Sequence, residues 1–94
     1  MNIQNEDNGK KGRFFVEEDG MRLAEMVYVW AGEKTFIVEH TEVDESLEGK
    51  GVGKRLVQQA VEFARAGDLK LIPLCPFTKG IIDKTPIYQD VLRA

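Results

Sequence analysis

Apolar residues in the first half of the chain follow the pattern of three β-strands. A short β-prone run at residues 13–17 is closed by turn residues, and residues 21–31 carry apolar side chains on both faces, with Glu25 as the exception. We therefore expect the second strand to be central in a sheet and covered on both sides. A further turn leads into residues 34–43, so the pattern predicts an antiparallel meander of three strands.

The third predicted strand contains the only histidine of the chain. A regular alternation would place His40 and Glu42 on the same face as Phe36 and Val38. A half-buried histidine on an apolar face is more often a hydrogen-bonded core residue than a catalytic one, and both roles stay open for His40.

Residues 50–66 have the periodicity of an amphipathic helix, with apolar side chains on one face at Val52, Leu56, Val57, Ala60, Phe63 and Ala64. Residues 69–74 then form a short strand. A strand, a helix and a strand in this order predict parallel pairing of the third strand with the new one. Pro73 cannot donate a ladder hydrogen bond, so we expect the two strands to separate there and leave a wedge between them.

The two ends of the chain are less regular. Residues 80–84 and 87–92 are predicted to be short helical segments, the second preceded by the Thr85-Pro86 pair. Residues 1–12 are polar and show neither helical nor strand periodicity, so we expect a flexible N-terminus. A single domain is predicted over residues 13–94.

Between the third strand and the long helix lies a glycine-rich turn, Glu48-Gly49-Lys50-Gly51-Val52-Gly53-Lys54. The first turn of a helix has free N–H donors and a partial positive charge, and glycines let an anion approach the backbone closely. The turn is therefore a candidate phosphate site, although a plain strand-to-helix turn has the same pattern.

Composition narrows the classes of function. The chain has 94 residues and a formal net charge of −3, which argues against a general nucleic-acid binder. The single cysteine, Cys75, excludes an internal disulfide and cannot form a zinc site alone, so we expect no metal. The N-terminus lacks an apolar targeting segment and no run is long enough to span a membrane. We expect a soluble, cytoplasmic, monomeric protein.

Acidic residues gather where the third predicted strand ends, at Glu39, Glu42, Asp44 and Glu45. Such a run is either a solvated loop or an attractor for an ammonium group.

Three motifs in order, HTEV at residues 40–43, GKGVGKRLV at residues 49–57 and PLCPF at residues 73–77, resemble the GNAT superfamily of N-acetyltransferases. Gly51 and Gly53 match the glycines of that superfamily's pyrophosphate motif, whereas Glu48 stands where Gln or Arg is usual. The likeness is greatest to the small single-domain branch, the YjdJ-like or Acetyltransf_CG-type acetyltransferases. It implies an α+β (α/β) GNAT-like fold without the usual first helix pair, with acetyl-CoA as donor and an amine as acceptor.

The resemblance also implies roles for individual residues. The backbone of Thr41, Glu42 and Val43 would pair with the pantetheine arm. The pyrophosphate would bind the residues of the glycine turn, namely Glu48, Gly49, Lys50, Gly51, Val52, Gly53 and Lys54. Cys75, Pro76 and Phe77 would also bind the cofactor, with Cys75 close to the acetyl thioester. Tyr88 is the candidate proton donor to the CoA thiolate.

Several chemical alternatives remain at this stage. His40 or Glu42 could accept the amine proton, and Cys75 or Tyr88 could return one to sulfur. Cys75 could instead be a nucleophile, with His40 lowering its pKa, or a packed small hydrophobe. Direct transfer from acetyl-CoA to a protein lysine or a small cationic amine is the favoured function. The alternative is a noncatalytic acyl-CoA-binding or regulatory interaction module.

Overall fold

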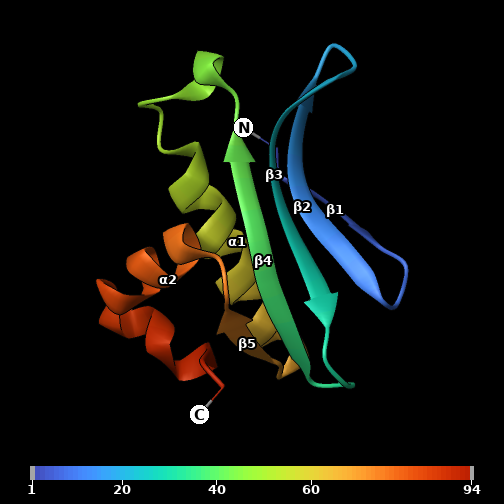
Figure 1. Cartoon of the computed structure of the whole chain (residues 1–94), viewed down its shortest axis with the longest axis vertical. Coiled ribbons are helices and arrows are strands. Elements are labelled where there is room, and N and C mark those ends of the chain that lie inside the picture. The colour runs from blue at the N-terminus through green and yellow to red at the C-terminus, as the bar shows by residue number, and fades with distance from the viewer. Residues whose placement is uncertain (1, 94) are drawn as a thin grey trace.

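The computed structural model describes residues 2–93 and places the strands in one five-stranded sheet, in the order β1-β2-β3-β4-β5 (Figure 1). The elements are β1 (Gln4–Asp7), β2 (Lys11–Glu18), β3 (Met21–Trp30), β4 (Thr35–Val43), η1 (Glu45–Leu47), α1 (Val52–Gly67), β5 (Lys70–Pro73), α2 (Pro76–Asp83) and η2 (Pro86–Val91). Strands β1 to β4 pair antiparallel, and β5 pairs parallel to β4 after the α1 crossover. The predicted α+β GNAT-like arrangement, a meander followed by one parallel crossover, is confirmed.

The prediction of a flexible N-terminus over residues 1–12 is wrong. Residues Gln4–Asp7 form β1, which pairs with β2 in a hairpin. Every side chain of β1 is exposed, so this edge strand carries no apolar alternation that sequence reasoning could detect. Met1 and Ala94, which belong to the predicted segments 1–12 and 13–94, lie outside the described residues.

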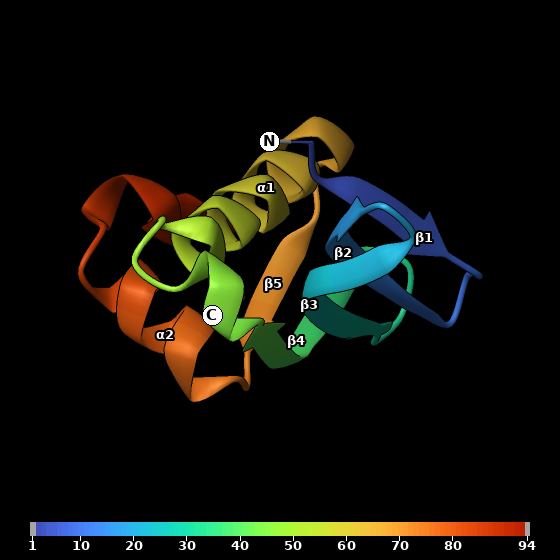
Figure 2. The same cartoon turned by 90° about the horizontal axis from the view of Figure 1, so that it is seen from above.

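Helices cover only one face of the sheet. Figure 2 shows α1 running along that face and α2 beside the β5 end, and α1 packs against β2, β3, β4 and β5. Among residues 2–93 no helix lies on the opposite face, so Leu23, Val27 and Val29 of β3 are only half-buried. The prediction that β3 is covered on both sides is therefore wrong, because just two residues, Asp19 and Gly20, connect β2 to β3.

The core lies between α1 and the sheet and is rich in aromatic rings. Tyr28 is fully buried, with the rings of Phe14, Phe36 and Phe63 at centroid distances of 5.2, 5.3 and 5.8 Å. Each buried aromatic ring stabilises the fold by roughly 1.5–3 kcal/mol, because its apolar surface is removed from water. Phe63 brings α1 into this cluster and so packs the helix on the sheet.

A β-bulge interrupts the alternation of β4. Val27 pairs with His40 but its neighbour Tyr28 pairs with Val38, so Glu39 is an extra residue on β4. Beyond the bulge the faces are exchanged, and Thr41 is opposite the buried Met26. The prediction that His40 and Glu42 share the Phe36–Val38 face is therefore wrong, and both side chains are exposed.

Strands β4 and β5 separate as Pro73 predicts. Their register runs from Thr35↔Lys70 to Val38↔Pro73, after which a single backbone bond among residues 2–93, from the Cys75 N–H to the Val38 carbonyl at 2.9 Å, joins the two segments. Helix α2 begins earlier than predicted, because Pro76 occupies its first turn and Cys75 is its N-cap.

Candidate functional site

The glycine turn before α1 has the open backbone that an anion requires. Gly49 and Gly51 have φ angles of +79° and +73°, which residues with a Cβ rarely adopt, and nothing lies within 4 Å of the position that a Cβ would take. Gly51 is the N-cap of α1, and no side chain caps the helix. Within residues 2–93, the N–H groups of Val52, Gly53 and Lys54 donate to no acceptor outside the helix.

The side chains around this turn complete a site for a negatively charged group. Lys50 and Lys54 are exposed beside the free N–H groups, and the first turn of α1 contains no acidic residue. Val52 contributes only its backbone, because its side chain is in the core. Glu48 is exposed and its N–H closes η1, so it adds a carboxylate rather than a donor side chain to this rim.

The wedge between β4 and β5 opens toward the same end of the molecule. Past Val38, residues up to Val43 of β4 are paired on one side only, with β3, so their other edge is free of strand partners in the described chain. Phe77 lies on the opposite side of the opening, 46% exposed, and its ring lies against Gly53 at the start of α1. Thr41 and Pro76 border the same opening, with Thr41 half-buried and Pro76 exposed.

Cys75 lies at the base of the wedge, buried and with no disulfide partner. Its Sγ donates to Thr41 Oγ1 at 3.5 Å. Burial opposes ionisation, but the Thr41 and Thr78 side chains and the N–H groups of Thr78 and Phe77 outweigh it and lower the pKa of the Cys75 thiol. Cys75 is the N-cap residue of α2, but its side chain forms no regular capping hydrogen bond with the first turn of the helix. The thiol is therefore closer to ionisation than an ordinary cysteine.

His40 and Glu42 form a pair on the uncovered face of the sheet. His40 Nε2 lies 2.9 Å from Glu42 Oε1, and this hydrogen bond raises the pKa of the imidazole. Cys75 instead contacts Thr41, which points to the helical face, so the structure places the His40 ring and the Cys75 thiol on opposite sides of β4. The pKa of Cys75 is lowered by its hydroxyl and N–H neighbours, whereas the electrostatic interaction of His40 with Cys75 contributes to the raised pKa of the imidazole.

Tyr88 lies in η2, away from the other candidates. Arg65 holds this segment by donating to Asp90 Oδ1 at 2.7 Å and to the Ile87 carbonyl. Arg65 is about 18 Å along α1 from Gly53, at a rise of roughly 1.5 Å per residue, whereas Cys75 is near the Gly53 end. The structure brings Thr41, Cys75 and Phe77 together with the glycine turn and does not bring Tyr88 to them.

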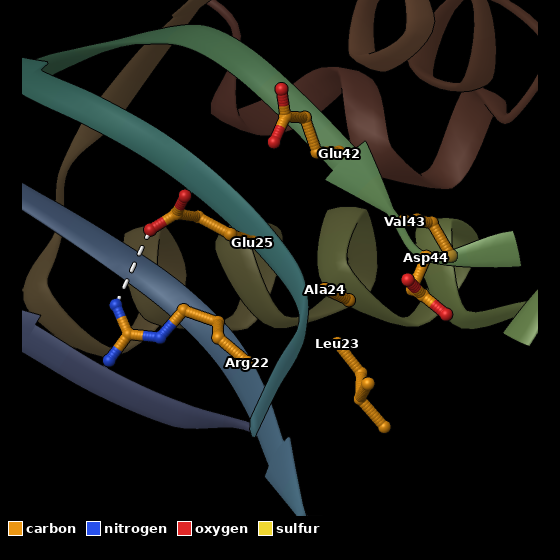
Figure 3. A pocket seen from close by; sticks show the side chains of 7 residues that line it. All are labelled: Arg22, Leu23, Ala24, Glu25, Glu42, Val43 and Asp44. Atoms are coloured by element: carbon orange, nitrogen blue, oxygen red, sulfur yellow. Dashed lines mark hydrogen bonds and ion pairs between the residues drawn. The ribbon is translucent and has the colours of Figure 1, made fainter. Parts of the chain in front are cut away.

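A pocket of about 440 Å³ opens between the ends of β3 and β4 (Figure 3). Arg22, Leu23, Ala24, Glu25, Glu42, Val43 and Asp44 line it. Glu25 and Glu42 are directly opposite each other in the register, an unfavourable placement for two like charges. Glu25 is compensated by Arg13 at 3.2 Å and Arg22 at 3.4 Å. Two features of the sequence indicated this pocket, namely the charged Glu25 within an apolar strand and the acidic run that includes Glu42 and Asp44.

Comparisons with known proteins identify the family. The family model described as GCN5-related N-acetyl-transferase (Acetyltransf_CG) matches residues 13–91. Protein NATD1 of Xenopus tropicalis is 30% identical over 92 residues, which are 97% of this chain and 84% of that protein. The solution structure of a GCN5-like protein from Staphylococcus aureus has a TM-score of 0.71 at 34% identity, covering 99% of this chain and 90% of that one.

A more distant structure shows the fold alone. The ribosomal-protein-alanine N-acetyltransferase of Brucella melitensis has a TM-score of 0.64 at 19% identity, covering 93% of this chain and 64% of that chain. None of the helices in residues 2–93 is long and apolar enough to cross a membrane. From the family match and the structural similarity together, we conclude that the chain belongs to the GCN5-related N-acetyl-transferase family, in its Acetyltransf_CG branch.

Proposed function

We propose that this chain is an acetyl-CoA-dependent N-acetyltransferase that transfers the acetyl group directly to a cationic amine, such as a protein lysine, in a ternary complex. The observation that carries the proposal is the coincidence of two openings. The glycine turn with its free N–H groups and the wedge between β4 and β5 lie at the same end of α1, and the low-pKa thiol of Cys75 lies between them.

The donor site fits acetyl-CoA. The open space at Gly49 and Gly51, with Lys50 and Lys54 beside it, suits the pyrophosphate. The one-sided backbone of Thr41 to Val43 offers hydrogen bonds to the amide groups of the pantetheine arm. Acetyl-CoA supplies an activated acetyl thioester, and the protein must hold it close to the amine. Good alignment alone can lower the barrier by roughly 7–11 kcal/mol.

Protons are handled by residues on both sides of β4. The Glu42–His40 pair is exposed beside the pocket, where it can accept the proton of an arriving ammonium once the imidazole is neutral. Cys75 on the other side can give its proton to the departing CoA thiolate. Tyr88, the donor that the resemblance implied, lies beside Arg65 toward the other end of α1 and has no part in this scheme. A covalent acetyl group on Cys75 is the alternative to direct transfer, although an amine attacks thioesters without such help.

The acceptor side is open and acidic. The face of the sheet that carries His40 and Glu42 has no covering helix within residues 2–93, and the pocket combines Glu25, Glu42 and Asp44 with Arg22. Asp44 is partly committed, because it accepts hydrogen bonds from Ser46 at the start of η1. Glu25 is compensated by Arg13 and Arg22, so the exposed Glu42 is the carboxylate that favours a cationic amine, and the absence of enclosing walls favours one presented by a protein.

A titration with acetyl-CoA, followed by heteronuclear NMR, tests the donor site. We expect saturable shifts centred on residues 43–54. Gly51→Val should weaken binding roughly tenfold or more, because a side chain enters the phosphate cradle. Gly9→Val is the matched control: Gly9 also has a positive φ, +88°, and open space at its Cβ, but it lies in the β1–β2 turn. Equal losses in both variants, or no binding by the wild type, would refute the donor site.

Turnover is tested separately with a panel of lysine peptides, polyamines and amino sugars. The proposal expects the mass increase of one acetyl group on a cationic amine. Saturable acetyl-CoA binding without acetylation of any amine would instead support a noncatalytic acyl-CoA-binding module.

A further inference from the structure

One buried hydroxyl has no role in the fold. Thr78, in the first turn of α2, is 0% exposed, and its Oγ1 is the only buried side-chain nitrogen or oxygen among residues 2–93 without a hydrogen-bond partner. Most buried polar groups in native proteins are paired, because an unpaired one has lost its water without compensation. A buried hydroxyl without a partner in the resting protein therefore indicates a hydrogen bond that forms at another stage of the reaction.

The sulfur of Cys75 can supply such a partner, because the Thr78 side chain is among the groups that lower the pKa of that thiol. Cys75 is the N-cap of α2 and Thr78 is its third helical residue, the two positions whose side chains face each other in a capping box. In the neutral state the thiol donates its proton to Thr41 Oγ1. A neutral thiol is a weak acceptor, so Thr78 gains little from it, whereas a thiolate is a strong acceptor.

We propose that Thr78 is a positioning residue that stabilises the thiolate of Cys75 by donating its hydroxyl hydrogen to Sγ, together with Thr41. This role rests on the proposed acetyl transfer. The S–H bond of Cys75 breaks as its proton passes to the departing CoA sulfur, where a new S–H bond forms. Cys75 is left as a thiolate, which then accepts from Thr78 and from the rotated Thr41 hydroxyl. The proton released by the acceptor amine restores the thiol.

Other charged groups around the sulfur come from each packed element. His40 on β4 interacts electrostatically with Cys75, and Glu42 is paired with His40. Lys54 extends from the first turn of α1, and Lys79 on α2 is held by Asp83 at 2.7 Å. His40 is the neighbour whose titration must be separated from that of the thiol, because the two groups interact electrostatically.

The experiment is a pH titration of the ultraviolet absorbance of the thiolate in the full chain, with Cys75→Ala as the background. The chain has one cysteine, so the signal reports Cys75 alone. Thr78→Val removes the hydroxyl at nearly constant volume and should raise the titration midpoint by roughly one pH unit. Thr78→Ser keeps a hydroxyl and should retain the wild-type midpoint, and His40→Gln measures the contribution of the imidazole.

The outcomes separate this inference from the proposed function. Thr78→Val removes an unpaired buried hydroxyl, so it should fold at least as stably as the wild type. A folded Thr78→Val with an unchanged midpoint, or a Thr78→Ser midpoint equal to that of Thr78→Val, overturns the inference even if acetyl transfer is found. The titration uses no acetyl-CoA, so a missing acetyltransferase activity would refute the proposed function and leave the midpoint result intact.

Discussion

Two polar clusters lie against the core of this protein, and they differ in how completely they are paired. In the hairpin cluster (Asn5, Asp7, Tyr28 and Trp30), the Tyr28 hydroxyl donates to Asp7 Oδ2 at 2.7 Å and accepts from Asn5 Nδ2 at 3.0 Å. Trp30 Nε1 also donates to Asp7 Oδ2, at 2.9 Å. In the wedge cluster (Thr41, Cys75 and Thr78), the one hydrogen bond is long and the Thr78 hydroxyl has no partner.

The difference separates a structural cluster from a functional one. The hairpin cluster attaches the exposed strand β1 to a buried ring, and no donor or acceptor of Tyr28 is left over for a ligand. In the wedge cluster the Thr78 hydroxyl has no partner and the pKa of the Cys75 thiol is lowered. Such an arrangement is suited to stabilising the negative charge that the sulfur would gain during a reaction. Two glycines, one beside each cluster, allow this contrast to be tested.

Gly12→Ala should have the largest effect on stability. A Cβ at Gly12 would overlap the ring of Tyr28, which is fully buried and held at its hydroxyl by Asn5 and Asp7. The ring cannot move without breaking these bonds, so we expect a loss of about 1–3 kcal/mol in the free energy of unfolding. Urea denaturation measures it, and the acetyl-CoA affinity of the folded fraction should be unchanged.

Gly53→Ala creates the same kind of overlap with Phe77, a residue beside the wedge cluster, and should be nearly neutral for stability. Its Cβ would meet the end of the Phe77 ring, which is 46% exposed and can swing outward. Alanine is also favoured over glycine by up to roughly 0.8–1.0 kcal/mol, the value for a helix interior, although Gly53 is only the second residue of α1. We expect a change within about 1 kcal/mol in urea denaturation, with a shifted Phe77 ring signal in NMR. A loss as large as that of Gly12→Ala would show that Phe77 is as rigid as Tyr28.

The sequence predicted the elements that have a strong hydrophobic periodicity or that end at a proline. The apolar face of residues 50–66 indicated α1, and Pro73 indicated where β5 leaves β4, because a missing N–H donor has a fixed consequence for pairing. Strand β1 could not be found this way. It is held by hydrogen bonds of Asn5 and Asp7 to residues more than twenty positions away, and an all-exposed strand leaves no pattern.

The site was predictable in position but not in orientation. The glycine turn, Cys75 and the end of β4 are clustered as the motifs implied, since each follows from strand and helix order. One inserted residue, Glu39, exchanges the faces of β4 and moves His40 away from Cys75, and no residue type announces a bulge there. Thr78 gave no signal because its importance is a missing partner, which only coordinates reveal.

The smallest expected effect concerns the pH dependence of the hairpin cluster. Partial burial opposes ionisation of Asp7, but hydrogen bonds from Tyr28, Gly9 and Trp30 outweigh it and lower its pKa. A carboxyl whose pKa is lowered in the folded state stabilises the fold above its usual pKa, and this contribution is lost as the pH falls through the folded-state value. The wild type should therefore lose stability below about pH 4 relative to Asp7→Asn, whose amide oxygen still accepts from Tyr28 but does not titrate.

Unfolding free energies from pH 7 down to the acid limit measure this. Asp90→Asn serves as the reference for an exposed ion pair, that of Asp90 with Arg65. If the Asp7→Asn and wild-type curves stay parallel in acid, the Asp7 carboxylate is not what attaches β1 to Tyr28, and the hairpin cluster depends on Asn5 alone.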